Sequence, residues 1–174
     1  EFVFKGELET RPLPTGGYLL VGSSLCGGRS YAILKDFFKK TLLEFTGIDM
    51  GDEELYEVMN RVAEASAAEP AALAIDTRFA GTRMEPSIRG SIRDIGIENL
   101  TPAALSRGIA LGMVRELTDK IPSELRRSFD RVLAGGNAAR ANPLLRRFIS
   151  EETGLPCELA AEKEEAATGA ALVA

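Results

Sequence analysis

The sequence of 174 residues contains no histidine, and this absence removes several kinds of catalytic site. Ser-His-Asp and Cys-His sites need an imidazole as the base, and many zinc sites use one as a ligand. The only cysteines, Cys26 and Cys157, lie far apart and not in metal-ligand spacing, so they are interpreted as reduced thiols. Any chemistry here must therefore use carboxylates, main-chain amides or residues supplied from elsewhere.

Long apolar runs are also missing. No run approaches the roughly 20 residues that cross a bilayer, and no charged-then-apolar signal segment begins the chain. These features argue against a membrane protein and predict a cytoplasmic one. The chain begins with Glu1 rather than Met, which suggests a piece of a longer protein.

The net charge is −5, and no long basic stripe is present, which argues against a nucleic-acid-binding protein. Six arginines lie between Arg126 and Arg147, and a series of glutamates follows from Glu151 to Glu165. We interpret them as solvated faces joined by opposite-charge pairs, with an anion-attracting rim as the alternative.

Strand and helix patterns alternate along the chain, which predicts an α/β layer fold. Turn residues at 11–17 separate the first two strands. Thr101-Pro102 and Asn142-Pro143 each begin a helix, and Gly47 and Gly154 each end one. The expected strands are 1–9, 18–21, 73–75, 91–95, 131–134 and 155–159, and the main helices follow Gly28, Gly51, Thr101, Asn142 and Lys163. The buried face of the helix after Thr101 is expected to carry Leu105, Ile109, Met113, Leu117 and Ile121.

Two glycine-containing turns connect an expected strand to an expected helix. Gly135-Gly136-Asn137 follows a buried strand, where glycines allow the main chain to approach a ligand closely. Gly22-Ser23 begins a second such turn, with small residues and hydroxyls that could admit phosphate or ribose oxygens. From the residues alone, a simple turn is the favoured interpretation of Gly135-Gly136-Asn137, whereas for the segment that begins with Gly22-Ser23 a simple turn and a ligand site are equally consistent with the pattern.

The loop from Asp76 to Gly90 is long and rich in arginine. Its arginines could clamp a phosphate, or they could pair with carboxylates and fix the loop. Asp76 and Glu85 are the only carboxylates in it, and no catalytic pair is evident, so we favour the structural interpretation.

The order of these motifs resembles the C-terminal half of the FGGY carbohydrate kinases over nearly the whole chain. The resemblance is carried by the segment 18–28, by the loop with Arg83, Pro86 and Arg89, by the Gly135-Gly136-Asn137 turn and by the tail 165–173. Within that family the segment 18–28, the loop with Arg83, Pro86 and Arg89, and the tail 165–173 are most similar to sedoheptulokinases. The resemblance implies a ribonuclease H-like lobe of the actin-type ATPase superfamily, with a sheet flanked by helices.

The resemblance also implies ATP and Mg²⁺ as cofactors and a ketose such as sedoheptulose as substrate. Residues Gly135, Gly136 and Asn137 would line the adenosine site, with Asn142 nearby, while Gly22 and Ser23 would face the nucleotide. The last helix would pack behind this pocket through its small residues. No catalytic or metal-binding residue is expected in this chain.

The chain is expected to be the nucleotide-binding lobe over residues 1–174. It would lack the N-terminal lobe, which makes most of the sugar contacts, and the phosphate loop at the start of the C-terminal lobe. An isolated lobe of this kind is expected to be inactive, because phosphoryl transfer needs a base and a positioned acceptor. The open sheet edge would favour a homodimer. The alternative is a non-catalytic interaction or regulatory module that retains the fold.

Overall fold

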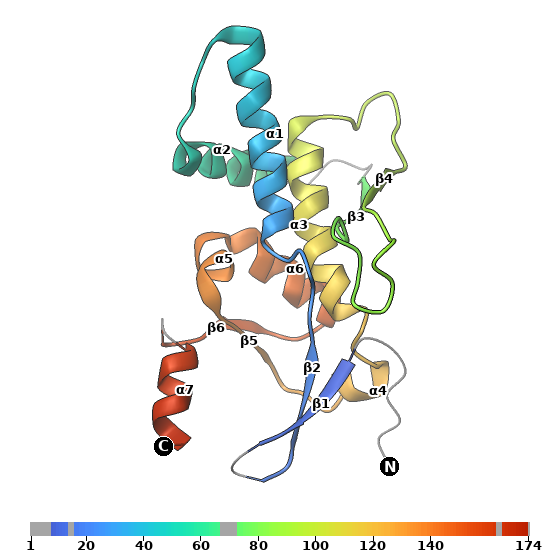
Figure 1. Ribbon diagram of the computed structural model, residues 1–174, viewed down its shortest axis with the longest axis vertical. Helices are drawn as coiled ribbons and strands as arrows, with labels where there is room; N and C mark the ends of the chain where they lie inside the picture. Colours follow the sequence, from blue (N-terminus) through green and yellow to red (C-terminus); the bar gives the residue numbers. More distant parts are fainter. Residues whose placement is uncertain (1–7, 14–15, 67–72, 163–164, 174) are drawn as a thin grey trace. The chain divides into compact units, whose positions relative to one another are not determined.

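The structure is a computed structural model, which describes residues 8–13, 16–66, 73–162 and 165–173 (Figure 1). Short runs of strands and of helices follow one another along it, and the predicted α/β class is confirmed. The strands are β1 (Leu8–Pro12), β2 (Tyr18–Gly22), β3 (Ala74–Asp76), β4 (Ser91–Arg93), β5 (Val132–Ala134) and β6 (Cys157–Leu159). The helices are α1 (Arg29–Thr46), α2 (Asp52–Ala65), α3 (Pro102–Thr118), α4 (Ser123–Arg126), α5 (Gly136–Ala141), α6 (Pro143–Thr153) and α7 (Glu165–Val173).

The described strands pair as three two-stranded sheets. Strands β1 and β2 are antiparallel, as are β3 and β4, whereas β5 and β6 are parallel. The chain divides into two compact units, one formed by Leu25–Glu116 and the other by the segments before and after it. Sheet β3–β4 belongs to the first unit, and the other two sheets belong to the second.

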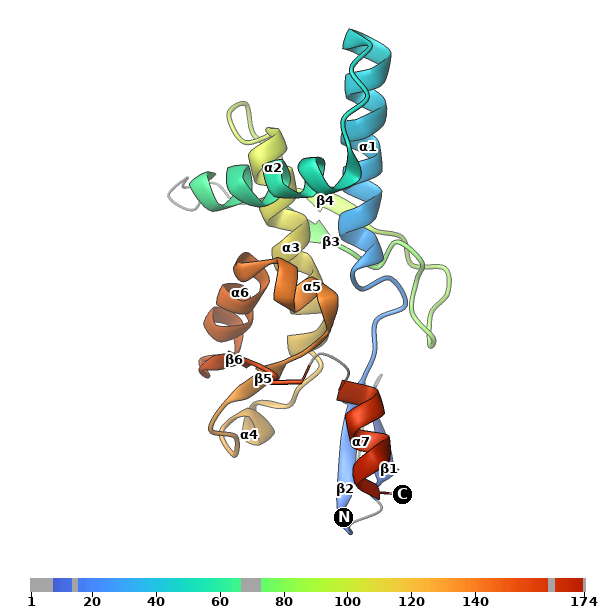
Figure 2. The same cartoon turned by 90° about the vertical axis from the view of Figure 1, so that its left-hand side faces the viewer.

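Salt bridges join the first two helices. Helix α2 runs across α1 (Figure 2), and the ammonium of Lys35 lies 2.8 Å from one carboxylate oxygen of Asp52. Lys39 lies 2.8 Å from the other oxygen of Asp52, and Lys35 also contacts Asp36 at 2.5 Å. The hydrogen bonds from Lys35 and then Lys39 lower the pKa of Asp52 to about 2. The hydrogen bonds that Lys35 donates to Asp36 and Asp52 raise the pKa of Lys35, so its nearly buried side chain keeps its charge.

Helix α3 is buried around most of its circumference. The Thr101 hydroxyl accepts a hydrogen bond from the amide of Ala104 at 3.1 Å, which confirms the predicted N-cap. Gly108 and Gly112 let α3 lie directly against β3, because a β-carbon at Gly112 would be only 2.4 Å from the carbonyl oxygen of Ile75.

The predicted stripe on α3 is therefore too narrow. The buried residues also include Ala104, Ser106, Ala110, Leu111 and Val114. Two predicted members were wrong, since Leu117 is exposed and Ile121 lies beyond the end of the helix. The small residues Ala104, Ser106 and Ala110 explain part of the difference, because they let neighbouring groups approach sides of the helix that no large apolar residue marks as buried.

Other sequence predictions differ from the structure at the ends of strands and helices. The residues Arg11 and Pro12, predicted as part of a turn, end strand β1 and pair with Leu19 and Tyr18. Proline is compatible with that position, because β1 has β2 as its only described neighbour and proline can occupy an edge strand. The predicted strand over 1–9 lies largely outside the described residues. Helix α4 was not predicted, because one polar turn has no apolar period to reveal it.

For the small residues of the last helix whose burial the structure describes, the expected packing is not found. In α7, the residues Ala167, Gly169, Ala170 and Ala171 are all exposed, and a β-carbon at Gly169 would meet no atom within 4 Å. Small side chains permit close packing without requiring it, since each buries little apolar surface.

Candidate functional site

The Gly135-Gly136-Asn137 turn lies directly after the carboxyl end of β5, as predicted. Gly135 has an extended backbone and precedes α5, while Gly136 has a φ of +79°, a conformation that favours glycine. A β-carbon at Gly136 would meet no atom within 4 Å, and all three residues are exposed. The main chain here is open to a ligand at the end of a parallel strand, where α/β proteins bind them. The turn thus leaves room for a ligand.

Asn142 has a structural role next to this turn. Its side-chain oxygen accepts a hydrogen bond from the amide of Leu144 at 3.0 Å and thereby caps α6. Pro143 occupies the first helical position, where its missing N–H group is not needed. Asn142 is buried, so this cap holds the short connection between α5 and α6 in place.

Gly22 and Ser23 lie at the end of the β1–β2 sheet. The ammonium of Lys120 donates a hydrogen bond to the carbonyl oxygen of Ser23 at 3.0 Å. A β-carbon at Gly22 would approach the side chain of Leu8 to 3.0 Å, which accounts for a small residue at this position. Lys120 was not identified from the sequence, where it is an isolated lysine after α3 with no motif around it.

The two predicted turns thus follow strands of different sheets. Gly22 and Ser23 follow β2, whereas Gly135, Gly136 and Asn137 follow β5, and the pairing of the described strands does not join these sheets. Asn142 is brought close to the second turn by α5. The structure therefore gives one well-defined local feature, the β5–α5 turn, and leaves the nucleotide role of all six residues as a prediction.

Arginines fix the chain around the β5–α5 turn by binding carbonyl oxygens. Arg140 donates to the carbonyls of Ala160, at 2.9 Å, and Glu162, so it ties α5 to the chain that leaves β6. Arg146 donates to the carbonyl of Ala139 at 2.5 Å, near the end of α5. These contacts hold α5, the helix that follows the turn, to α6 and to the chain after β6.

The expected opposite-charge pairing of the arginine-rich region is only partly correct. Arg131 lies 3.5 Å from Glu158, and Arg147 lies 3.5 Å from Glu151. Arg126 instead donates to carbonyl oxygens, including those of Ile121 and Glu152. A guanidinium has five N–H donors and can satisfy the carbonyls left over at helix ends, which the charge pattern alone does not show.

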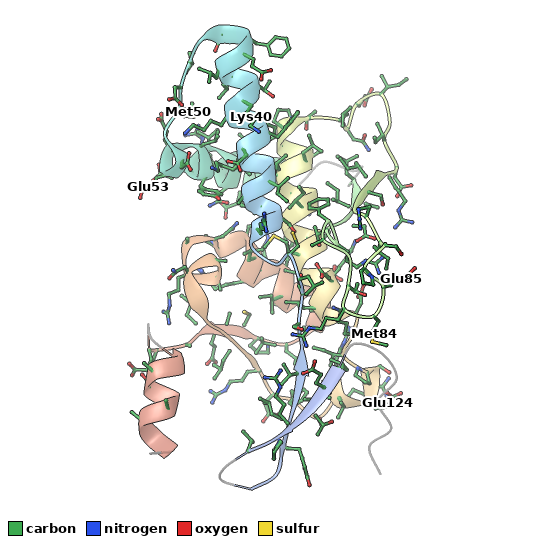
Figure 3. The ribbon with its side chains drawn as sticks, in the orientation of Figure 1. Lys40, Met50, Glu53, Met84, Glu85 and Glu124 are labelled. Carbon is green, nitrogen blue, oxygen red and sulfur yellow. The ribbon has the colours of Figure 1, made fainter. Side chains whose placement is uncertain are left out.

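The arginine-rich loop between β3 and β4 is fixed by its own residues, as the structural interpretation predicted. Arg78 binds the Asp76 carboxylate with two nitrogens, at 2.9 and 2.6 Å, and lowers the pKa of Asp76. Arg89 donates to the carbonyls of Pro86 and Ile88. Met84 and Glu85 lie at the outer turn of this loop (Figure 3).

Metal-binding residues do not gather anywhere in the ranges that the structure describes, since no three Cys, Asp or Glu side chains come together there. Over the same ranges, every helix is too short or too polar to traverse a bilayer.

Comparisons with known proteins show which solved structures have a similar architecture. The chain is similar to the crystal structure of xylulose kinase from Bifidobacterium adolescentis, with a TM-score of 0.74 and 23% identity over 97% of this chain. It is also similar to xylulose kinase from Rhodospirillum rubrum, with a TM-score of 0.66 and 17% identity over 98% of this chain. The chain spans 31% and 33% of the lengths of those two proteins, respectively. No curated protein sequence matches it significantly.

The fold is therefore the predicted ribonuclease H-like fold of the actin-type ATPases, as in the C-terminal lobe of these kinases. Neither of these two structures is a sedoheptulokinase, so they do not support the predicted likeness to sedoheptulokinases. The profile of the FGGY family of carbohydrate kinases, C-terminal domain, matches residues 9–174. The chain belongs to the FGGY family of carbohydrate kinases.

Proposed function

We propose that this chain, over residues 1–174, supplies the ATP-binding part of a carbohydrate kinase. The observation that carries the proposal is the exposed Gly135-Gly136-Asn137 turn at the end of β5, in a chain of the FGGY family. ATP would provide the phosphoryl group, and Mg²⁺ would neutralise its phosphates. In this proposal the β5–α5 turn binds the adenosine part, Asn142 maintains the turn by capping α6, and Gly22 with Ser23 approaches the nucleotide from β2.

The acceptor is proposed to be a hydroxyl group of a ketose. Two observations support this class: the resemblance of the sequence to sedoheptulokinases, and the structural likeness to two xylulose kinases. Sedoheptulose and xylulose are thus the substrates to compare. The sugar and the catalytic base are expected to be held by another lobe, so this chain alone should not phosphorylate either sugar. A cytoplasmic location stays a prediction of the sequence.

The nucleotide site can be tested with a pair of matched variants. Gly136→Asn adds a side chain in the open space of the turn, and asparagine tolerates positive φ better than most residues. Gly154→Asn makes the same change at the C-cap of α6, where φ is +72° and the space is also open. We expect Gly136→Asn to weaken binding of a fluorescent ADP analogue at least about tenfold, a loss of about 1.4 kcal/mol, and Gly154→Asn to leave binding unchanged.

Equal binding by both variants and the unaltered chain would contradict the placement of adenosine at this turn. Complete absence of ADP binding by the unaltered chain would favour the second function, a non-catalytic interaction module. Transfer of phosphate to sedoheptulose or xylulose by this chain with ATP and Mg²⁺ would contradict the expected need for another lobe.

A further inference from the structure

The chain directly after β6 is bonded to both flanks of the Gly135-Gly136-Asn137 turn. The amide of Ala160 donates a hydrogen bond to the carbonyl oxygen of Ala134 at 2.9 Å, and Ala134 is the last residue of β5. The carbonyl oxygen of Ala160 accepts a hydrogen bond from the guanidinium of Arg140 at 2.9 Å, and Arg140 lies in α5, the helix into which the turn leads. One residue therefore holds the chain before the turn and the chain after it.

These hydrogen bonds leave the middle of the turn open. Ala134 and Ala139 are buried, whereas the four residues between them are exposed. Arg140 uses the same nitrogen, Nη2, for the carbonyl oxygen of Ala160 and for that of Glu162. The exposed residues are thus accessible to a ligand, while the residues on either side of them are bonded to the chain after β6.

The local sequence allows many conformations of this turn. It contains two consecutive glycines, the residue type that loses the most conformational freedom on ordering. Helix α5 has 6 residues, which is too short for stability from its own hydrogen bonds. Its N-cap is Gly135, which has no side chain with which to cap the helix. Contacts from outside the segment must therefore order it, and Arg140 provides those that reach the chain after β6.

We propose that Arg140 is a positioning residue for the nucleotide, because its bond to Ala160 keeps the β5–α5 turn in the conformation that receives adenosine. This inference rests on the proposed function, since it takes the turn as the adenosine site. Arg140 acts through the main chain of the turn and not by touching the nucleotide. A ligand that meets an ordered turn loses no affinity to the ordering of that turn. Removal of the Arg140 contact therefore weakens binding although every group that contacts the nucleotide is still present.

Binding of a fluorescent ADP analogue tests the effect on affinity. Arg140→Met keeps much of the apolar part of the side chain and removes its N–H donors. If the turn is then competent in about a fifth of the molecules or fewer, the dissociation constant rises at least about fivefold. Arg140→Lys keeps the charge and N–H donors on a slightly shorter chain, so it should recover most of the lost affinity. The matched control is Arg131→Met, which removes the same charge from an exposed residue that pairs with Glu158, and it should leave ADP binding unchanged.

Amide-nitrogen order parameters from NMR relaxation report on the turn without any nucleotide. In Arg140→Met, the values for Gly136 and Asn137 should fall from about 0.85 towards the flexible range below about 0.6. The value for Phe148, which is buried in α6, should stay the same, as should all three values in Arg131→Met. A general loss of stability would not lower the values of the turn alone. If circular dichroism shows that Arg140→Met is unfolded, Arg140→Gln, whose side chain is too short to reach Ala160, replaces it in both measurements.

Three results would each overturn the role of Arg140: equal ADP affinity of Arg140→Met and the unaltered chain, unchanged order parameters in the turn, or an equal loss of affinity in Arg131→Met. An unaltered chain that binds no ADP would contradict the proposed function itself, and with it the nucleotide role of Arg140. The order parameters are measured without nucleotide, so they distinguish that result from a failure of the Arg140 contact alone.

Discussion

Replacing Gly112 by alanine would add one methyl group where α3 lies closest to β3. The new carbon would be 2.4 Å from the carbonyl oxygen of Ile75 and 2.9 Å from the methyl carbon of Thr77. Carbon and carbonyl oxygen normally approach to about 3.3 Å, so the helix and the strand would have to separate by about 1 Å. Because the nearest atom belongs to the main chain, it cannot rotate away.

Two opposing contributions determine the size of the effect. Overpacking of this kind costs about 1–3 kcal/mol, and the rigid contact puts Gly112→Ala at the upper end. Alanine gains about 1 kcal/mol over glycine within a helix. We therefore expect Gly112→Ala to lower the free energy of unfolding by about 2 kcal/mol.

Two other helical glycines provide controls for urea unfolding followed by circular dichroism. A β-carbon at Gly108 would meet mainly the side-chain end of Ile75, at 2.8 Å, which can shift, so Gly108→Ala should be nearly neutral. Gly169 in α7 has open space, and Gly169→Ala should stabilise by about 0.5–1 kcal/mol. A Gly112→Ala variant as stable as Gly169→Ala would refute the close contact between α3 and β3.

Three further predictions concern single sites. The pKa of Asp52 is lowered to about 2 from 3.8, so the stability that its ionised form contributes is present above pH 4 and is lost as the pH falls from about 4 to 2. The difference in the free energy of unfolding between the unaltered chain and Asp52→Asn should therefore shrink over that interval. The hydroxyl of Thr118 is buried and has no hydrogen-bond partner among the described residues, so Thr118→Val should raise the free energy of unfolding by about 1 kcal/mol, and a loss of stability would contradict this. A β-carbon at Gly90 would overlap the ring of Phe79 at 1.9 Å, so Gly90→Ala should destabilise by about 2 kcal/mol. Gly96→Ala, where the nearest atom would be 3.9 Å away, is its control in the same urea titration and should be neutral.

The ends of several helices could be predicted from the sequence because local chemistry determines them. Thr101 and Asn142 accept hydrogen bonds from amides of the helices that they begin. Gly47 and Gly154 end α1 and α6 with φ values of 73° and 72°, which glycine adopts without strain. Each of these signals needs only a few neighbouring residues.

Other features depend on contacts between distant parts of the chain and could not be predicted in this way. Arg140 binds carbonyls some twenty positions later, and Lys120 binds the carbonyl of Ser23 across 97 positions. The same limit applies to the candidate site. The position of the Gly135-Gly136 turn after β5 follows from local pattern, whereas its relation to Gly22 depends on how the sheets assemble, which neither turn encodes.

Calorimetric titration of the unaltered chain with ADP tests the central claim most directly. A site at the β5–α5 turn predicts a saturable heat that corresponds to one ADP per chain, and that Gly136→Asn diminishes. A titration without heat beyond dilution, at protein concentrations where circular dichroism shows the chain folded, would contradict the ATP-binding function.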